Sequence, residues 1–116
     1  MRLITIFIMV ALVASCGGGK RRAPQPTGQV TRFSSGPISQ ACMASDRKAR
    51  NPQLCGCIQT VANMSLSPSD QRRATKFFAD PHQAQVVRQS DSSINEAFWR
   101  RYVEFADRAE SGCQGY

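Results

Sequence analysis

The sequence predicts an all-α fold, a small disulfide-stapled bundle of four to five short helices behind a signal peptide and a flexible tether. Apolar residues recur at helical spacing, and the alternation typical of strands is absent. Proline beside asparagine, serine or aspartate marks several helix starts. Five cysteines occur in 116 residues. We expect the folded part to span residues 38–116, which is enough for one core but marginal without covalent support.

Residues 1–15 have the pattern of an export signal, because Arg2 precedes a short apolar run that ends in small residues. The run is well short of the ~20 apolar residues that a membrane-crossing helix needs. Val13-Ala14-Ser15-Cys16 resembles the bacterial lipobox. That resemblance implies cleavage before Cys16 and a diacylglycerol on its sulfur. The alternative is an ordinary secretory peptide that contains a cysteine near its cleavage site.

Residues 16–37 have the composition of a flexible basic tether, rich in glycine, proline, serine and threonine. Lys20, Arg21 and Arg22 follow the lipidation site closely, so we expect them to strengthen binding to a membrane with anionic lipids. A solubilising patch in a linker is the alternative. Residues 38–116 contain ten basic and eight acidic residues, a net charge of only +2, so we expect no nucleic-acid partner.

Lipidation of Cys16 would leave an even four cysteines, Cys42, Cys55, Cys57 and Cys113. In an oxidising compartment four cysteines predict two disulfides, with three possible connectivities. Pairing Cys55 with Cys57 is disfavoured, because residues two apart on a helix lie about 200° apart around its axis. The other two connectivities stay open. A helical hairpin turning near residue 51 gives a weak preference for Cys42–Cys57 and Cys55–Cys113.

The first helix is expected to run from Ile38 to about Ala49, and Asn51-Pro52 ends it and opens the second. The second helix has the broadest apolar face and is the predicted central element. Its apolar face consists of Leu54, Cys55, Ile58, Val61 and Ala62, continued by Met64 and Leu66.

The third helix is expected to start at Ser67-Pro68, with Ser67 as its cap, and to contribute Phe77 and Phe78 to the core. Asp80-Pro81 predicts a fourth, short helix. The last helix is the longest, with a capping box from Ser93 to Glu96 and a C-terminal stop near Gly112. Its expected core stripe consists of Ile94, Phe98, Tyr102, Phe105 and Ala109, flanked by Trp99 and Val103.

The cysteines and the single histidine offer little catalytic chemistry. Cys55-Gly56-Cys57 could exchange thiols, which gives one functional hypothesis, but structural disulfides are the favoured interpretation. His82 follows a helix-opening proline and is expected on the surface, without a nucleophile pattern nearby. We therefore expect no enzymatic activity, no cofactor and no metal site.

A binding surface is the more informative possibility. Arg72, Arg73, Arg100 and Arg101, together with the basic stretch 47–50, could meet an anionic partner such as an acidic protein, a lipid headgroup or lipopolysaccharide. Trp99 could anchor such an interface, since tryptophan and arginine are enriched at binding hot spots. The alternative is a set of ordinary solvated helix faces with Trp99 in the core. A small bundle offers little room for an enclosed ligand, so we expect no small-molecule ligand.

The stretch 37–113 resembles a small family of exported proteins from alphaproteobacteria related to Rhodobacter, whose members are often labelled arginine transporters. The resemblance is carried by Ile38-Ser39-Gln40-Ala41-Cys42, Gln53-Leu54-Cys55-Gly56-Cys57-Ile58-Gln59, Ser69-Asp70-Gln71-Arg72-Arg73 and Arg88-Gln89-Ser90-Asp91 before Phe98-Trp99. A carrier needs several membrane-spanning segments. The label therefore implies at most an accessory to the transport of basic amino acids.

These patterns favour a non-enzymatic lipoprotein of the cell envelope that faces the periplasm and binds a protein or another envelope component. Gly17 rather than aspartate after the lipidation site favours the outer membrane. The alternatives are the transport accessory and thiol–disulfide exchange through the Cys-Gly-Cys pair.

Overall fold

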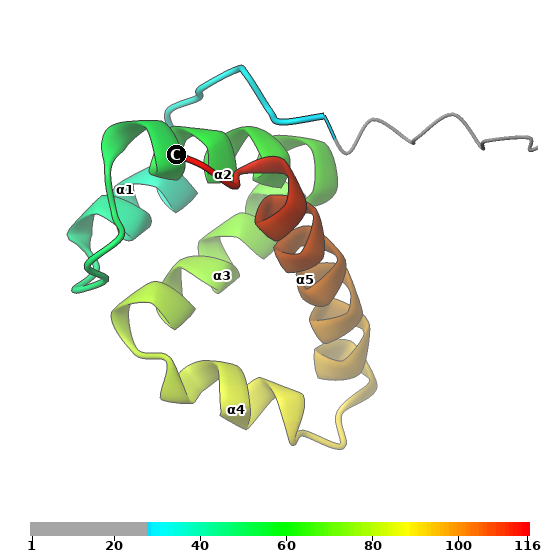
Figure 1. The fold of residues 1–116 in the computed structure, drawn as a ribbon. Coiled ribbons are helices and arrows are strands. Elements are labelled where there is room, and N and C mark those ends of the chain that lie inside the picture. Colours follow the sequence, from blue (N-terminus) through cyan, green and yellow to red (C-terminus); the bar gives the residue numbers. More distant parts are fainter. Residues whose placement is uncertain (1–27) are drawn as a thin grey trace, which may run out of the picture.

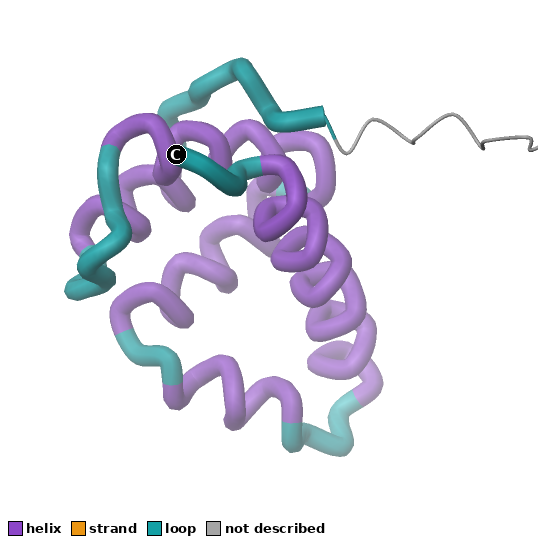
Figure 2. Tube along the Cα trace, viewed as in Figure 1, coloured by secondary structure: helices purple, strands orange, loops and turns teal. Residues whose placement is uncertain are grey.

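The computed structural model describes residues 28–116, which form five helices and no strand within that range (Figures 1 and 2). The helices are α1 (Pro37–Ala44), α2 (Pro52–Ser65), α3 (Pro68–Ala79), α4 (His82–Arg88) and α5 (Ser93–Gly112). The predicted all-α, disulfide-stapled bundle is confirmed. The expected signal peptide (residues 1–15), the expected lipidation site Cys16 and the basic residues 20–22 lie outside the described part. Across residues 28–116, none of the helices combines the length and the apolar character needed to span a bilayer.

Helix α2 is the central element, as predicted. It packs against α1 on one side and α5 on the other, while α3 packs on α1 and α4 bridges α3 to α5 (Figure 1). Seven of its residues are buried, namely Cys55, Gly56, Cys57, Gln59, Thr60, Val61 and Ala62. The short side chains among them let neighbouring segments approach the helix closely.

The predicted helix starts at residues 52 and 68 are confirmed by their caps. The Asn51 side chain accepts a hydrogen bond from the Leu54 amide at 2.8 Å, and the Ser67 hydroxyl accepts one from the Asp70 amide at 3.1 Å. Each cap satisfies an amide that has no partner within the helix. The cap of α5 is Ser92 rather than Ser93, so that prediction was wrong by one residue.

Helix α1 is shorter than expected, because it ends at Ala44 rather than near residue 49. The hydroxyl and the amide of Ser45 both donate to the Cys42 carbonyl, at 2.6 and 3.3 Å. A serine that bonds the preceding turn in this way competes with continuation of the helix. Residues 45–51 therefore form a loop, and its basic residues do not lie on a helix face.

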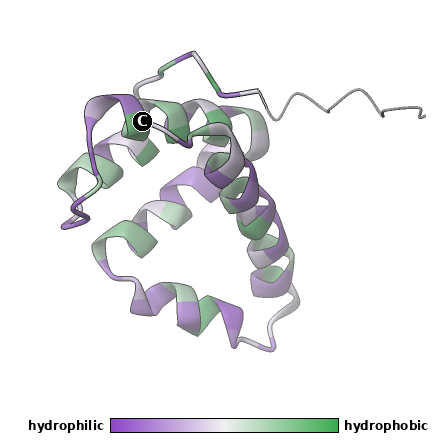
Figure 3. Ribbon diagram, in the orientation of Figure 1, coloured by the Kyte–Doolittle hydropathy of each residue, from purple (hydrophilic) through white to green (hydrophobic). Residues whose placement is uncertain are grey.

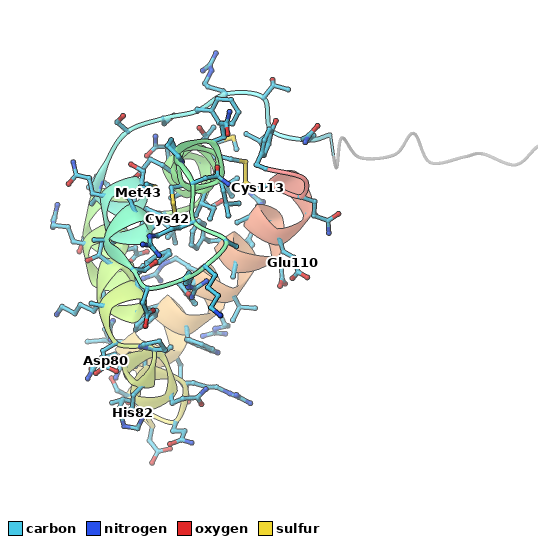
Figure 4. The ribbon with its side chains drawn as sticks, turned by 60° about the vertical axis from the view of Figure 1, so that its left-hand side comes forward. Cys42, Met43, Asp80, His82, Glu110 and Cys113 are labelled. Carbon is cyan, nitrogen blue, oxygen red and sulfur yellow. A yellow bond between two sulfur atoms is a disulfide. The ribbon has the colours of Figure 1, made fainter. Side chains whose placement is uncertain are left out.

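The disulfides are Cys42–Cys55 and Cys57–Cys113, with Cα atoms 5.6 and 5.8 Å apart. The weak preference for Cys42–Cys57 was wrong, because it assumed that the first helix continued to residue 50. With the turn made by a long loop, the end of α1 lies beside the first turn of α2 and Cys42 reaches Cys55. Cys57 projects from the other side of α2, toward the end of α5. Figure 4 shows the labelled Cys42 and Cys113 near one end of the bundle.

The aromatic core forms where α3 meets α5. Phe77 and Phe78 are buried as predicted, and so are Phe98 and Phe105 of the expected α5 stripe. Two apolar residues were wrongly assigned to the core, since Ile94 is 73% exposed and Met64 is 63% exposed. Ile94 lies in the first turn of α5, near the start of that helix. Figure 3 shows hydrophilic and hydrophobic residues along this same helix, as expected for an amphipathic one.

A buried polar network joins α1, α2 and α3. The Oε1 atom of Gln59 accepts hydrogen bonds from the amides of Ile38 and Ser39, at 2.8 and 3.0 Å. Its Nε2 atom donates to Asn63 and Gln71, at 2.9 and 2.8 Å. Gln59 is only 1% exposed. It thus caps the first turn of α1 from inside the protein, a role that no local sequence pattern indicated.

Residues 28–36 form an extended strap along α2 and the C-terminus, which differs from the flexible tether expected up to residue 37. The Val30 amide donates to the Gly112 carbonyl at 2.7 Å, and the Ser34 amide donates to the Gly56 carbonyl at 3.0 Å. The Tyr116 hydroxyl donates to the Val30 carbonyl at 2.6 Å, and the Phe33 ring lies edge-on to the Tyr116 ring. The folded unit therefore includes the strap, because backbone hydrogen bonds hold it.

We expect Gly112→Ala to loosen the strap without unfolding the bundle. A Cβ atom at position 112 would lie 2.9 Å from Cγ2 of Val30, so the strap would have to shift. Losing one backbone hydrogen bond of about 1 kcal/mol should lower the hydrogen-exchange protection of the Val30 amide about fivefold. Amides inside α2 should keep theirs. The neighbouring exposed Ser111→Ala is the control, and equal protection of Val30 in both variants would contradict the packing described.

Candidate functional site

The basic residues predicted to bind a partner have different environments in the structure. Arg101 forms an ion pair with Asp70 of α3, with its Nε and Nη2 atoms donating at 2.6 and 3.1 Å. This hydrogen bonding raises the pKa of Arg101. Arg101 thus already has an acidic partner within the fold.

Arg73 is also engaged inside the bundle. Its guanidinium lies 4.3 Å from the centroid of the Phe98 ring and donates a hydrogen bond to the side chain of Asn95. A half-buried arginine over an aromatic face contributes to packing as well as charge. Arg72, on the neighbouring position of α3, is exposed.

Trp99 and Arg100 do lie together, in a shallow concavity of about 300 Å³ completed by Arg88 and Glu96. We call these four residues the distal notch. The Trp99 ring is half-buried and packs against Phe77 and Tyr102, with centroids 6.4 and 5.4 Å away. Trp99 therefore contacts the aromatic core and also lines a surface concavity. The sequence did not identify Arg88 as part of this surface. Its place in the last turn of the predicted fourth helix was the only feature that could have indicated it.

The distal notch lies at the end of the bundle remote from the strap. From Glu96 to Gly112, where the strap is bonded, α5 rises by about 24 Å at 1.5 Å per residue. Figure 4 shows Asp80 and His82, at the start of α4, at one end of the molecule and Cys113 near the other. The first residues of the strap therefore lie at the end opposite the notch.

A second concavity of about 360 Å³ lies between α2, α5 and the loop after α1. We call it the α2–α5 groove. Its walls are mainly apolar, and they include Leu54 and Ile58 of α2 and Phe105 of α5. Arg47 also lines it, whereas Lys48 and Arg50 of the predicted basic stretch do not. The bundle thus leaves more room for a ligand than the sequence indicated.

The charge of Arg47 acts on Tyr102, which also lines the groove. Burial raises the pKa of Tyr102 above its ordinary value of 10.0, and the nearby Arg47 lowers it. Because the folded-state pKa stays above the unfolded one, this phenol stabilises the fold below pH 10 and loses that contribution as the pH rises through the folded-state pKa.

We expect Arg47→Gln to raise the pKa of Tyr102 further, because the phenolate would lose a neighbouring positive charge. A titration of ¹³C-labelled tyrosine followed by NMR measures this value for Tyr102 directly. Lys48→Gln is the matched control, since it removes a charge from the same loop outside the groove. If Arg47→Gln left the pKa of Tyr102 unchanged or lowered it, the guanidinium would not lie close to the phenol.

The cysteine pair singled out for thiol exchange is enclosed. Cys55 and Cys57 are both 0% exposed, and each is bonded to a different partner. A thiolate could attack either sulfur only after the bundle opened. Within residues 28–116 no three of the side chains histidine, cysteine, aspartate and glutamate cluster as metal ligands would. His82 is exposed, and its amide donates to the Asp80 carboxylate at 3.1 Å.

Comparison with known proteins adds no assignment, because no protein-family model, curated sequence or solved structure matches this chain.

Proposed function

We propose that this protein is a non-enzymatic lipoprotein of the cell envelope whose helical domain binds an acidic protein through the distal notch. In this proposal a lipid on Cys16 and the basic residues 20–22 hold the chain on a membrane, with the outer membrane favoured. The domain faces the periplasm. The observation that carries the binding role is the grouping of Trp99, Arg88 and Arg100 at the end of the domain remote from the strap.

Two disulfides support an oxidising compartment. Structural disulfides form and persist in the periplasm and outside the cell, and they are rare in the cytosol. The pairs Cys42–Cys55 and Cys57–Cys113 join the two helices flanking α2 to that helix. This agrees with the export signal expected from residues 1–15.

The chemistry of the notch favours an acidic protein over the supporting bilayer. Its two arginines outnumber Glu96, so it carries a net positive charge, and the Trp99 ring adds an apolar surface. Arginine binds carboxylates through two parallel hydrogen bonds. The first described residues of the chain lie beside Gly112 and Gln114, at the end of α5 opposite the notch, so the notch is separate from the point where the tether joins the domain.

The test uses the lipidated chain in cells, with a photo-crosslinking amino acid at Val103, which is 38% exposed one turn after the notch. We expect one acidic envelope protein to be crosslinked. The double charge reversal Arg88→Glu with Arg100→Glu should lower its yield at least tenfold. The matched control reverses Arg72 and Lys76, two exposed basic residues of α3 outside the notch.

Equal loss of the crosslink in both double variants, or no loss in either, would overturn the assignment of the notch. The same variants are also mixed with vesicles of phosphatidylcholine and phosphatidylglycerol. Vesicle binding that depends on Arg88 and Arg100 would assign the notch to lipid headgroups instead.

The anchor is tested separately by the intact mass of the protein purified from membranes. We expect a diacylglycerol adduct on Cys16 and four oxidised cysteines. An unlipidated mature chain would remove the membrane tether from the proposal. The alternative role in arginine transport is tested by calorimetry with free arginine, and saturable binding would favour it.

A further inference from the structure

The α2–α5 groove has the dimensions and the walls of a small-ligand site. Its volume of about 360 Å³ lies within the range of roughly 300–1,000 Å³ that is typical of such sites. Leu54 and Ile58 are half-buried on one wall, and Phe105 and Ala109 form the other. Apolar walls of this kind favour contact with the hydrocarbon part of a ligand. The groove shares no lining residue with the distal notch, so it is a separate surface.

Two hydrogen-bond donors, the Arg47 guanidinium and the Tyr102 hydroxyl, line the groove. The Arg47 guanidinium lies 5.3 Å from the centroid of the Phe78 ring, and its charge reaches Tyr102. The ion pairs among residues 28–116 are Arg101–Asp70 and Arg108–Glu104, so Arg47 has no acidic partner in that part of the chain. A guanidinium and a phenol, both hydrogen-bond donors, therefore border an apolar surface.

The groove also carries the opposite charge, farther along α5. Glu110 is eight residues after Tyr102, about 12 Å farther along α5. Figure 4 shows Glu110 near Cys113, at the C-terminal end of that helix. A negatively charged ligand group would be attracted to Arg47 and repelled by Glu110, which fixes the direction in which an elongated ligand lies.

We propose that the α2–α5 groove binds a free amphipathic carboxylate of the fatty-acid class, with the carboxylate on Arg47 and Tyr102 and the hydrocarbon chain between α2 and α5. The apolar walls bury the chain, and the carboxylate accepts charge-assisted hydrogen bonds from the guanidinium. A neutral hydrocarbon would cover part of Arg47 without giving it a partner. This inference goes beyond the proposed function, which concerns the notch.

The experiment uses the full lipidated protein in nanodiscs of phosphatidylcholine and follows methyl resonances by NMR. Octanoate is the probe, and octanol is its neutral counterpart of equal chain length. We expect octanoate to shift the methyl resonances of Leu54 and Ile58 saturably. Octanol should bind at least tenfold more weakly, because it lacks the charged contact.

Arg47→Gln should weaken octanoate binding about tenfold and leave octanol binding unchanged. Lys48→Gln, in the same loop but outside the groove, should change neither. Ala106→Phe should weaken both probes, because the larger ring would fill the groove that Ala106 lines. Thermal unfolding of each variant checks that the bundle is intact.

Equal affinities for octanoate and octanol, or octanoate binding unaffected by Arg47→Gln, would overturn the proposal. Shifts of Leu54 and Ile58 caused by free arginine and lost in Glu110→Gln would also overturn it, since they would assign the groove to a cationic ligand. None of these outcomes alters the crosslinking result expected for the notch, so the two proposals fail independently.

Discussion

Removal of the Cys57–Cys113 disulfide by the double substitution Cys57→Ala and Cys113→Ala is expected to lower the free energy of unfolding by about 4 kcal/mol. The bond closes 56 residues of chain, so its loss restores many conformations to the unfolded state. The Cys42–Cys55 bond closes only 13 residues, and the same relation gives about 3 kcal/mol for the corresponding double alanine variant. Urea unfolding followed by circular dichroism measures both values.

The second double variant is the matched control for the first, because each removes one buried disulfide without leaving a free partner thiol. A larger loss from the shorter loop would contradict the chain-entropy explanation. Non-reducing peptide mapping of the unmodified protein provides an independent check. We expect peptides joined through Cys42–Cys55 and Cys57–Cys113, and a Cys42–Cys57 peptide would contradict the fold itself.

Gln59→Leu is expected to cost about 3–5 kcal/mol of unfolding free energy. Leucine has a similar size, but it would leave the amides of Ile38 and Ser39 without an acceptor. It would also take a donor away from Gln71, which is 6% exposed. Each buried polar group left without a partner costs about 1–3 kcal/mol. The first turn of α1 should therefore lose hydrogen-exchange protection before the rest of the bundle.

Gln53→Leu is the control for this substitution, since Gln53 is an exposed glutamine on the same helix. We expect it to change the free energy of unfolding by less than about 0.5 kcal/mol, as is usual for surface positions. If both variants were equally stable, the buried network would contribute little and α1 would be held mainly by its disulfide.

Local patterns predicted the helices well because caps act within a few residues. The side chains of Asn51 and Ser67 each accept a hydrogen bond from the amide three residues later, so a short sequence pattern is enough to predict the cap. The residue at which α1 ends could not be predicted in this way. Ser45 could have been exposed on a longer helix, and its bond to the Cys42 carbonyl became evident only in the structure.

The candidate site was only partly predictable for a related reason. The sequence does not distinguish Arg73 and Arg101 from Arg72 and Arg100. In the structure Asn95 and Phe98 contact Arg73, and Asp70 forms an ion pair with Arg101. Arg47 was grouped with Lys48 and Arg50, although it alone lines the groove. The side chain that faces a charged residue comes from another helix, so the spacing within one helix does not reveal it.

By itself the sequence determined the helical fold, the central position of α2 and the presence of two disulfides, because periodicity, caps and an even number of cysteines are local or additive properties. The tertiary structure alone decided the cysteine pairing, the capping of α1 by Gln59 and the binding of the strap to α2 and the C-terminus. These features join segments from about 13 to 86 residues apart. Their geometry depends on how the helices pack, and packing is settled only when all the buried faces are brought together.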